Sequence, residues 1–522
     1  MDSNQLFQNA PHFQTPTHSP SILSAQHNKF TQGVQNTPPS PVVPLSPTPP
    51  TYDQFYMTPR RSHNLVTSLT DVLINDLETC SYTSSNVQAP TISVSNTEYS
   101  GDTFRLSVSQ GKLVIRVIES PQSCSCVERR VPLGSIKDII CSDGVWRVKT
   151  KYNEVISIGR GEGVREWFRC GLRGWDLDGG LEDGEGCTAY DTDAFYLKCG
   201  VLEYTVRNYN EGFDLCATYP RTFVLPSTVT REMIFESSQV RYLNRFPFIV
   251  YVNTNGTALW RAAAVIRGKT DALFRKMGKS VQIFELTGKD GIAPSTQKIE
   301  EDYTIYISQI QDTENIKRNV ERSGWLRMIS KVITISNHIR YLLQKGETIE
   351  IESEEGKGVV SVVSSVVLFL IDSHYRTIKG VVEVIEKEWS KVGYSFGERN
   401  GKGVEFGKEA IEFVLMMQSL YTLLKQNPSG FEINENGLDV IMALLYSGAV
   451  TTFMYDCDKD CRTICGNKKT LYDDIKTKGS ITNEFFDVNS VLSVSGEMLT
   501  IPLWTGYYLK YSHPDIARLR LC

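Results

Sequence analysis

The stretch that decides the fold runs from Thr348 to Ile371 and reads TIEIESEEGKGVVSVVSSVVLFLI. Its first five residues alternate between polar and apolar side chains, which predicts a half-buried β-strand. The glutamates and glycines of 354–358 predict a tight loop, and the ten apolar residues and three serines of 359–371 predict a buried helix. A strand, a glycine-containing loop and a helix N-terminus form a cradle for phosphate, because backbone amides and the helix dipole converge on an anion there.

Six short sequence blocks follow one another over about 300 residues around this cradle. They are YNEGFDLCATYP at 209–220, RFP at 245–247, WL at 325–326, HYRTIKG at 374–380, FEIN at 431–434 and LWTGYY at 503–508. In this order they resemble the blocks of the myotubularins, cysteine-dependent phosphatases that act on 3-phosphoinositides. The resemblance implies a cysteine-phosphatase-like α/β domain over residues 188–512, with the cradle at the C-terminal end of a strand.

The cradle departs from the family pattern at the positions that carry its chemistry. The family loop reads His-Cys-Ser-Asp-Gly-Trp-Asp-Arg-Thr, and without a gap it falls on residues 352–360. The nucleophilic cysteine is then Ser353, and the aspartate assigned as general acid is Gly358. The arginine that grips phosphate is Val359, and Gly356 is retained.

These replacements remove the chemistry that the resemblance would otherwise imply. A thiolate forms at neutral pH because helix amides and cations depress the thiol pKa, whereas a serine hydroxyl stays protonated. Valine cannot grip phosphate through a planar fork as arginine does. The loop's own charges are three carboxylates and one cation, which we expect to repel an anionic head group: Glu352, Glu354, Glu355 and Lys357. We therefore predict a degenerate site, and we expect no Cys-x5-Arg spacing at any of the 12 cysteines that could form the site elsewhere.

The first 62 residues have the composition of a disordered tail. They hold 11 of the 21 prolines, and the first 59 hold three charged residues, so this segment cannot bury a core. Seven Ser/Thr-Pro steps fit either proline-directed kinase sites or an ordinary proline-rich tail. Pro49, Pro50 and Tyr52 belong to a PPxY sequence, which is either a docking motif for a WW-domain protein or a chance occurrence. Helical spacing of apolar residues predicts a short helix over 65–77.

Residues 97–173 alternate in the manner of short β-strands with turns between them. We predict strands at 104–108, 113–118, 131–140, 146–150 and 154–158, followed by an amphipathic helix at 162–172. An antiparallel β-sandwich with a capping helix resembles the PH-GRAM domain that precedes the catalytic domain of myotubularins. The glycine-rich, acidic segment 174–187 predicts a flexible linker. The expected fold class is therefore α+β and multidomain.

Two residue groups have competing interpretations. Seven basic residues of the PH-GRAM-like segment fit a phosphoinositide head-group site or, as we favour, a solvated strand face: Arg116, Arg129, Arg130, Lys137, Arg147, Lys149 and Lys151. Three cysteines recur every four residues, at Cys457, Cys461 and Cys465, which places them on one helix face. A metal site would need closer pairs and a fourth ligand, so we favour a structural stripe and expect neither metal nor cofactor.

Composition excludes several classes of function. A net charge of −5 gives no general attraction to nucleic acid or to an anionic membrane. The longest apolar run, 359–371, is interrupted by serines and too short to span a bilayer. The N-terminus has no signal-peptide pattern, and the scattered cysteines suit a reducing cytoplasm.

The resemblance implies an inactive member of the family, a pseudophosphatase that regulates 3-phosphoinositide metabolism with an active myotubularin at endosomal membranes. Such pairs often use a coiled coil after the catalytic domain. The sequence after Tyr508 contains no heptads, so we expect pairing through the folded domains or the tail. Two alternatives remain open: a phosphoinositide-binding membrane module without a phosphatase partner, attached weakly to its membrane, and an active phosphatidylinositol-3-phosphatase.

Overall fold

A computed structural model describes most of the chain after residue 202 and parts of it before. The described residues are 81–82, 91–94, 97–100, 103–109, 112–118, 126–142, 145–158, 191–192, 194–195, 203–288, 291–293, 295–310, 322–400, 408–464 and 469–510. The expected tail (1–62) with Pro49, Pro50 and Tyr52 lies outside them. So do the expected helices at 65–77 and 162–172 and the linker at 174–187.

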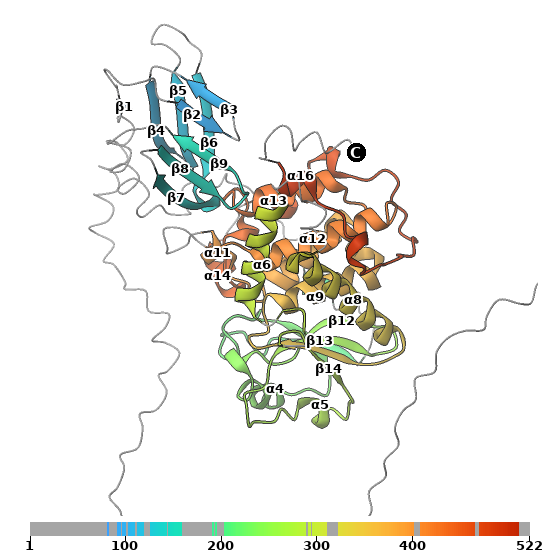
Figure 1. Cartoon of the computed structure of the whole chain (residues 1–522). Helices are drawn as coiled ribbons and strands as arrows, with labels where there is room; N and C mark the ends of the chain where they lie inside the picture. Colours follow the sequence, from blue (N-terminus) through green and yellow to red (C-terminus); the bar gives the residue numbers. More distant parts are fainter. Residues whose placement is uncertain are drawn as a thin grey trace, which may run out of the picture. The chain divides into compact units, whose positions relative to one another are not determined.

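Residues 81–158 form two antiparallel sheets (Figure 1). The first contains, in order, β1 (Ser81–Tyr82), β4 (Thr103–Ser109), β5 (Lys112–Ile118) and β6 (Cys126–Pro132). The second contains β3 (Thr97–Ser100), β2 (Thr91–Val94), β9 (Val155–Ile158), β8 (Val145–Thr150) and β7 (Ile136–Ser142). The predicted sheet-rich segment is therefore present, and it begins before residue 97.

One predicted strand is wrong in its extent. The segment 131–140 is divided by a 3-10 turn at Leu133–Ser135, which ends β6 at Pro132 and starts β7 at Ile136. Proline has no N–H to donate to a neighbouring strand, so a ladder ends readily there. The turn passes the chain from the first sheet to the second.

The larger domain is built on a four-stranded sheet in the order β12 (Phe248–Val252), β13 (Ala258–Ala263), β15 (Ile349–Ser353) and β14 (Gln282–Glu285). β12 and β13 pair antiparallel, whereas β15 lies parallel to both β13 and β14. The C-terminal ends of the three parallel strands therefore meet at one edge of the sheet, as expected for the cradle. A two-stranded sheet of β10 (Tyr204–Arg207) and β11 (Phe223–Pro226) accompanies it.

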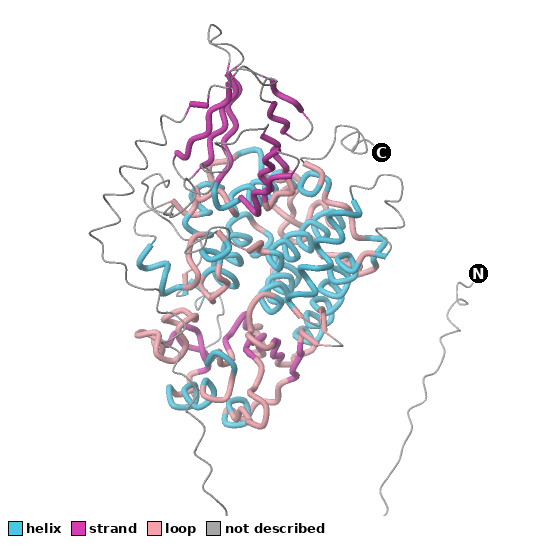
Figure 2. Tube along the Cα trace, turned by 60° about the vertical axis from the view of Figure 1, so that its left-hand side comes forward, coloured by secondary structure: helices cyan, strands magenta, loops and turns pink. Residues whose placement is uncertain are grey.

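Side chains of this sheet alternate between two apolar cores. Leu259 and Ile351 belong to the larger core, whereas Trp260 belongs to a smaller core on the other face. Figure 2 shows the helices gathered mainly on one side of the sheet. The helices of the larger core include α6 (Thr296–Ile310), α8 (Gly324–Gln344), α9 (Val359–Ile371), α10 (Ile378–Ile385), α12 (Ile411–Gln426), α13 (Glu435–Leu445) and α16 (Thr505–Tyr508). α4 (Arg231–Ser238) and α5 (Leu273–Lys276) supply the smaller core.

The helix α9 confirms the prediction of a buried helix at 359–371. All its residues are buried except the last, Ile371. Its serines are accommodated by hydrogen bonds: Ser365 Oγ donates to Ser361 O at 2.7 Å and accepts from Trp389 Nε1 at 2.9 Å. Buried hydroxyls with partners carry little penalty, which explains three serines in an otherwise apolar helix.

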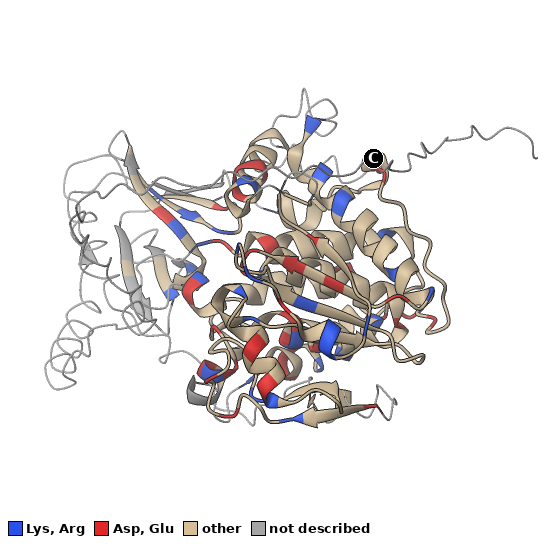
Figure 3. Cartoon of the chain, turned by 90° about the horizontal axis from the view of Figure 1, so that it is seen from below, with Lys and Arg blue, Asp and Glu red and all other residues tan. Residues whose placement is uncertain are grey.

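Charged residues of both signs are interspersed over the face that Figure 3 shows. Within the described part of the chain, no helix is both long enough and apolar enough to cross a membrane.

Candidate functional site

The predicted strand, loop and helix occur as expected. β15 ends at Ser353, and α9 begins at Val359. The carbonyl oxygen of Ser353 accepts hydrogen bonds from the amides of Ala264, at 2.8 Å, and Gly356, at 3.1 Å. The loop is therefore fastened to the neighbouring strand β13 at its first residue.

Gly356 occupies a position that excludes other residues for two reasons. Its φ of +62° lies in the left-handed region. A Cβ there would also lie 2.6 Å from the Ala263 amide nitrogen and 2.7 Å from the Ala262 carbonyl oxygen. The one residue of the family loop that this chain retains is thus required by the backbone alone.

Two buried arginines bind the loop through the carbonyl group of Gly356. Arg245 Nη2 and Arg261 Nη2 donate to the carbonyl oxygen of Gly356 at 2.9 and 3.1 Å. Arg261 also donates to Glu388 Oε2 at 2.8 Å, and both side chains are fully buried. Although burial alone would raise it, Lys387 and Arg261 hold the pKa of Glu388 below its ordinary value.

The expected charge balance of the loop needs correction, because it left out the buried arginines Arg245 and Arg261. Counting only the loop's own residues predicted three carboxylates against one lysine, but the residues packed on the loop supply further positive charge. Glu352 forms an ion pair with Arg241 at 3.3 Å, whereas Glu354 and Glu355 are exposed. Lys357 is half-buried, and its pKa is lowered by burial and then by the nearby Arg245.

A second buried charge cluster lies along the strand that leads into the loop. Arg241 contacts Asp271 Oδ2 at 2.6 Å and Glu350 Oε1 at 2.6 Å. Glu350 is fully buried in β15, and burial raises its pKa to about 7 in spite of Arg241. Burial also raises the pKa of Glu352. The guanidinium of Arg241 therefore forms ion pairs with three carboxylates, those of Asp271, Glu350 and Glu352.

The positions that should perform catalysis lie together and hold no suitable groups. Ser353 is 5% exposed at the end of β15. Gly358, with φ of +52°, has no side chain, and a Cβ there would contact Glu412 Oε1 at 3.1 Å. Val359 is 3% exposed and belongs to the larger core. The arrangement offers backbone amides but no thiol, acid or guanidinium at the three positions.

The wall of the loop beside Gly358 is formed by residues that no sequence pattern indicated. Glu412, at the start of α12, accepts from Tyr394 OH at 2.8 Å and lies 3.8 Å from Arg399 Nη2. The guanidinium of Arg399 lies 4.1 Å from the centre of the Tyr394 ring. Burial raises the pKa of Tyr394 well above its ordinary value, so it remains a hydrogen-bond donor.

The expectation that Cys-x5-Arg spacing is absent elsewhere needs correction. The spacing occurs from Cys124 to Arg130 and again in the sequence CSDGVWR from Cys141 to Arg147. Neither forms a cradle. Arg130 lies within β6, and Cys141 and Arg147 lie on the adjacent antiparallel strands β7 and β8. A cradle needs a helix N-terminus immediately after the loop, and β8 takes that place here.

Two of the three cysteines of the stripe lie within the described residues. α14 (Asp458–Ile464) begins just after Cys457, whose thiol pKa burial raises to about 11. Cys461 is half-buried, and Cys465 lies outside the described residues. Among the residues that the structure describes, no three His, Cys, Asp or Glu side chains are grouped to hold a metal.

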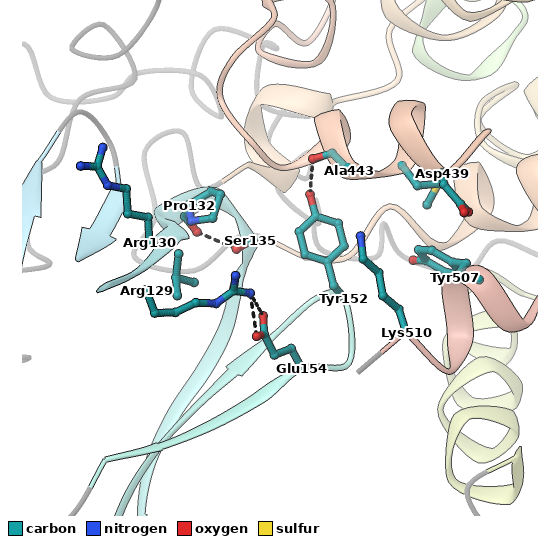
Figure 4. A pocket seen from close by; sticks show the side chains of 13 residues that line it. Arg129, Arg130, Pro132, Ser135, Tyr152, Glu154, Asp439, Ala443, Tyr507 and Lys510 are labelled. Atoms are coloured by element: carbon teal, nitrogen blue, oxygen red, sulfur yellow. Dashed lines mark hydrogen bonds and ion pairs between the residues drawn. The ribbon is translucent and has the colours of Figure 1, made fainter. Parts of the chain in front are cut away.

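A pocket lies where the N-terminal sheets meet α13 and α16 (Figure 4). Its cavity of about 190 Å³ is lined by basic and acidic side chains together, including Arg130, Asp439 and Lys510. Arg129, also in its wall, donates to both carboxylate oxygens of Glu154 at 2.7 and 2.8 Å. The basic residues here are balanced by carboxylates.

Two more of the seven basic residues contact the larger domain. Lys137 forms an ion pair with Glu409 at 2.7 Å. Lys151 Nζ donates to Gly134 O at 2.9 Å and Arg399 O at 2.5 Å. Burial lowers the pKa of Lys151 to about 7, against the opposing effect of Glu409. Arg129, Lys137 and Lys151 thus have protein partners, which argues against a head-group site composed of all seven.

The region that contains this loop matches a known protein family. A model of the myotubularin-like phosphatase domain matches residues 180–282 and 279–462. The chain belongs to the myotubularin family. Its phosphatase-like domain therefore includes the sheet, the loop and the arginines that bind Gly356.

Individual relatives are distant. The chain is 24% identical to phosphatidylinositol-3,5-bisphosphate 3-phosphatase MTMR6 of Caenorhabditis elegans over 395 residues, which cover 65% of this chain and 58% of that protein. It is 24% identical to myotubularin of Xenopus tropicalis over 382 residues, 63% of each chain. It is 26% identical to myotubularin-related protein 10 of Mus musculus over 307 residues, 53% of this chain and 39% of that protein. The matches span 58–63% of the first two relatives.

Gly356→Ala should destabilise the protein by about 3 kcal/mol, because the left-handed backbone and the crowding against β13 each cost roughly 1–2 kcal/mol. Gly268→Ala is the matched control, since Gly268 has a φ of +82° and no atom within 4 Å of an added Cβ. It should lose only the conformational part. Urea unfolding of the full chain measures both, and equal losses would contradict the close approach.

Glu350→Gln should gain stability relative to the wild type as pH rises from about 4.5 to about 7. Because the folded-state pKa of Glu350 is raised to about 7, the native wild type retains a proton that the unfolded chain has lost, and its stability falls across this window. Glutamine has no proton to lose, so the difference should grow by about 1–3 kcal/mol. Unfolding free energies at several pH values test this, with Glu354→Gln as an exposed control. Parallel profiles for wild type and variant would refute it.

Proposed function

We propose that this myotubularin is catalytically inactive and acts as an adaptor or regulator of 3-phosphoinositide metabolism, together with an active myotubularin. The observation that carries the proposal is the loop between β15 and α9. The loop joins a strand to a helix N-terminus, and the family resemblance assigns Ser353, Gly358 and Val359 to the positions of nucleophile, acid and arginine.

Each replacement blocks a different part of phosphate transfer. A serine without a base at hand is a poor nucleophile, because its hydroxyl remains protonated. Glycine cannot donate a proton to the leaving group. Valine at position 359 is buried in the core, so its side chain neither reaches nor charges the loop. Loss of one such element commonly costs several kcal/mol of transition-state stabilisation, and three are missing.

The maintained packing supports a role for the folded surface. Arg245 and Arg261 hold the carbonyl of Gly356, and Glu388 neutralises Arg261 in the same buried layer. These contacts preserve the domain's shape without supplying chemistry. A protein that keeps this architecture can still present its surfaces to a partner.

The domain assignments form part of the proposal. Residues 97–173 are assigned to a PH-GRAM-like domain, 174–187 to a linker and 188–512 to the phosphatase-like domain. The two antiparallel sheets support the first assignment, and β1 and β2 extend it toward the N-terminus. We place the protein in the cytoplasm, peripherally attached to endosomal membranes, and we assign Pro49, Pro50 and Tyr52 to a WW-domain partner.

A second candidate is a phosphoinositide-binding module that works without a phosphatase partner. Arg130 and Lys149 are exposed on the N-terminal sheets and are compatible with it. The ion pairs of Arg129 and Lys137 reduce the positive charge available for an anionic head group, so we rank this candidate second.

The purified chain should release no phosphate from phosphatidylinositol 3-phosphate or its 3,5-bisphosphate, because it lacks the three catalytic groups. Ser353→Cys alone should not restore release, since Gly358 and Val359 remain. A phosphate-release assay, with an active myotubularin as positive control, measures this. Release above a mock purification would refute inactivity, and release by Ser353→Cys alone would show that the other two positions are dispensable.

The adaptor role predicts that affinity purification of the full chain from its native cells recovers an active myotubularin. Ser353→Ala should recover the same partner in the same yield, because the proposed role does not use the loop's chemistry. Recovery of neither a lipid phosphatase nor a phosphoinositide kinase would remove support for the adaptor role. Retention on phosphoinositide vesicles in that case would favour the membrane module.

A further inference from the structure

We propose that residues 482–500 form a docking surface for a protein segment that carries apolar side chains together with Lys or Arg. This segment comes after α15 (Leu471–Ile475), passes the C-terminal end of α12 and contacts α8 at Ser330. Four large apolar side chains are exposed on it, and we call them the apolar ridge: Phe485 (81%), Val488 (49%), Val491 (91%) and Leu499 (86%). The other exposed large apolar side chains of the described residues are spread over 155–341.

The segment is fixed to the larger domain by two side-chain amides. Each of them binds both a backbone N–H and a backbone C=O group of the segment, as a neighbouring β-strand would. Asn427 Nδ2 donates to Ser493 O at 3.0 Å, and Asn427 Oδ1 accepts from the Ser493 amide at 2.8 Å. Gln426 makes the same pair of bonds with Ser495, at 2.9 and 3.1 Å. A segment held through both its amides and its carbonyls presents its outer side chains in a defined arrangement.

Further bonds hold the part that carries Phe485 and Val491. Asn483 Nδ2 donates to Pro428 O at 2.7 Å and to Phe431 O at 2.8 Å. The buried Arg376 donates through Nη1 to Ser490 O at 2.8 Å. The exposure of the ridge therefore does not arise from a lack of anchoring.

Some apolar side chains of the segment pack into the larger core, and others face solvent. Leu492 is 6% exposed and packs into the larger core, whereas Val491, its neighbour, is 91% exposed. Val494 and Met498 pack against the same core. The core contacts are thus made by other residues of the segment, and the ridge is left facing solvent. Exposed apolar residues that recur along one anchored segment are typical of interaction surfaces.

Charge distinguishes the kinds of partner. Glu484, Asp487 and Glu497 are exposed on the segment, and the sequence between Lys478 and Lys510 contains no lysine or arginine. The cation beneath the segment, Arg376, is 7% exposed. Three carboxylates around apolar side chains complement a basic, apolar protein segment and repel an anionic lipid surface.

This inference does not depend on the state of the catalytic loop. The ridge shares no residue with 353–358, so it would be present in an active or an inactive protein. It supplies the kind of surface through which a partner could be held without a coiled coil.

The first test uses the full chain and two synthetic amphipathic peptides, one of Leu and Lys and one of Leu and Glu. The Leu/Lys peptide should bind at least tenfold more tightly than the Leu/Glu peptide, in a salt-dependent manner. Val491→Ser with Leu499→Ser should weaken this binding at least tenfold, and so should Glu484→Lys with Asp487→Lys. Fluorescence anisotropy measures the affinities, and circular dichroism checks that the variants are folded.

The matched control is Ile283→Ser with Ile305→Ser, which removes apolar side chains that are 53% and 47% exposed elsewhere. It should leave peptide binding unchanged. Equal binding of the two peptides, or an equal loss in the control, would overturn the proposal. Loss of binding to phosphatidylcholine/phosphatidylserine vesicles in Val491→Ser/Leu499→Ser would reassign the ridge to a lipid surface, and loss of self-association would reassign it to a second copy.

A second test places a photo-crosslinking amino acid at position 491 of the full chain in its native cells. The crosslinked peptide should come from another protein, should contain apolar and basic residues, and should disappear with Glu484→Lys/Asp487→Lys. A crosslink at position 283 serves as the control. Crosslinks to lipid, to the chain's own N-terminal residues, or to nothing at all would each overturn the proposal.

Discussion

The conformation of the loop between β15 and α9 depends on one carbonyl group. The oxygen of Gly356 accepts hydrogen bonds from two buried guanidinium groups, those of Arg245 and Arg261. Hydrogen bonds from charged donors are stronger than neutral ones, and a buried cation that loses its acceptor is costly. The carbonyl can take this position only because Gly356 adopts a left-handed backbone next to β13. Backbone, strand and arginines therefore constrain one another.

The same constraint explains why the shape of the loop does not depend on the side chains at positions 353 and 359. These positions lie where β15 ends and α9 begins, whereas Arg245 and Arg261 bind the carbonyl of Gly356 between them. Ser353 and Val359 can change without disturbing Arg261 or Glu388, whose ion pair is fully buried. Breaking such a pair by removing one partner typically costs 3–5 kcal/mol of stability, which disfavours substitution of Arg261 or Glu388 alone.

Features that depend on neighbouring residues could be predicted from the sequence, whereas features that depend on residues far apart in the chain could not. The strand that ends at Ser353 and the helix that begins at Val359 were predictable because alternation and a long apolar run are local patterns. The arginines on Gly356 were not, because they lie about a hundred positions earlier in the chain. Arg261 is brought in by the pairing of β13 with β15, and Arg245 by a hydrogen bond from the Ala263 amide to its carbonyl. The break after Pro132 had a local signal in Pro132 and Gly134, which the strand prediction did not weigh, and the chain changes sheet there between β6 and β7. The role of Glu412 had no sequence signal, since its position depends on how α12 packs.

The hairpin of β7 and β8 has a consequence for recognising enzymes by their signatures. CSDGVWR, from Cys141 to Arg147, is closer to the family's catalytic letters than the loop that occupies the catalytic place. A search for the cysteine and arginine spacing alone would therefore select the hairpin of β7 and β8 rather than the loop ahead of α9. The two residues acquire chemical meaning only from the fold that positions them: ahead of a helix they could hold a phosphate, whereas on β7 and β8 they belong to an antiparallel ladder. A count of phosphatase sites that relies on this spacing alone would include this hairpin.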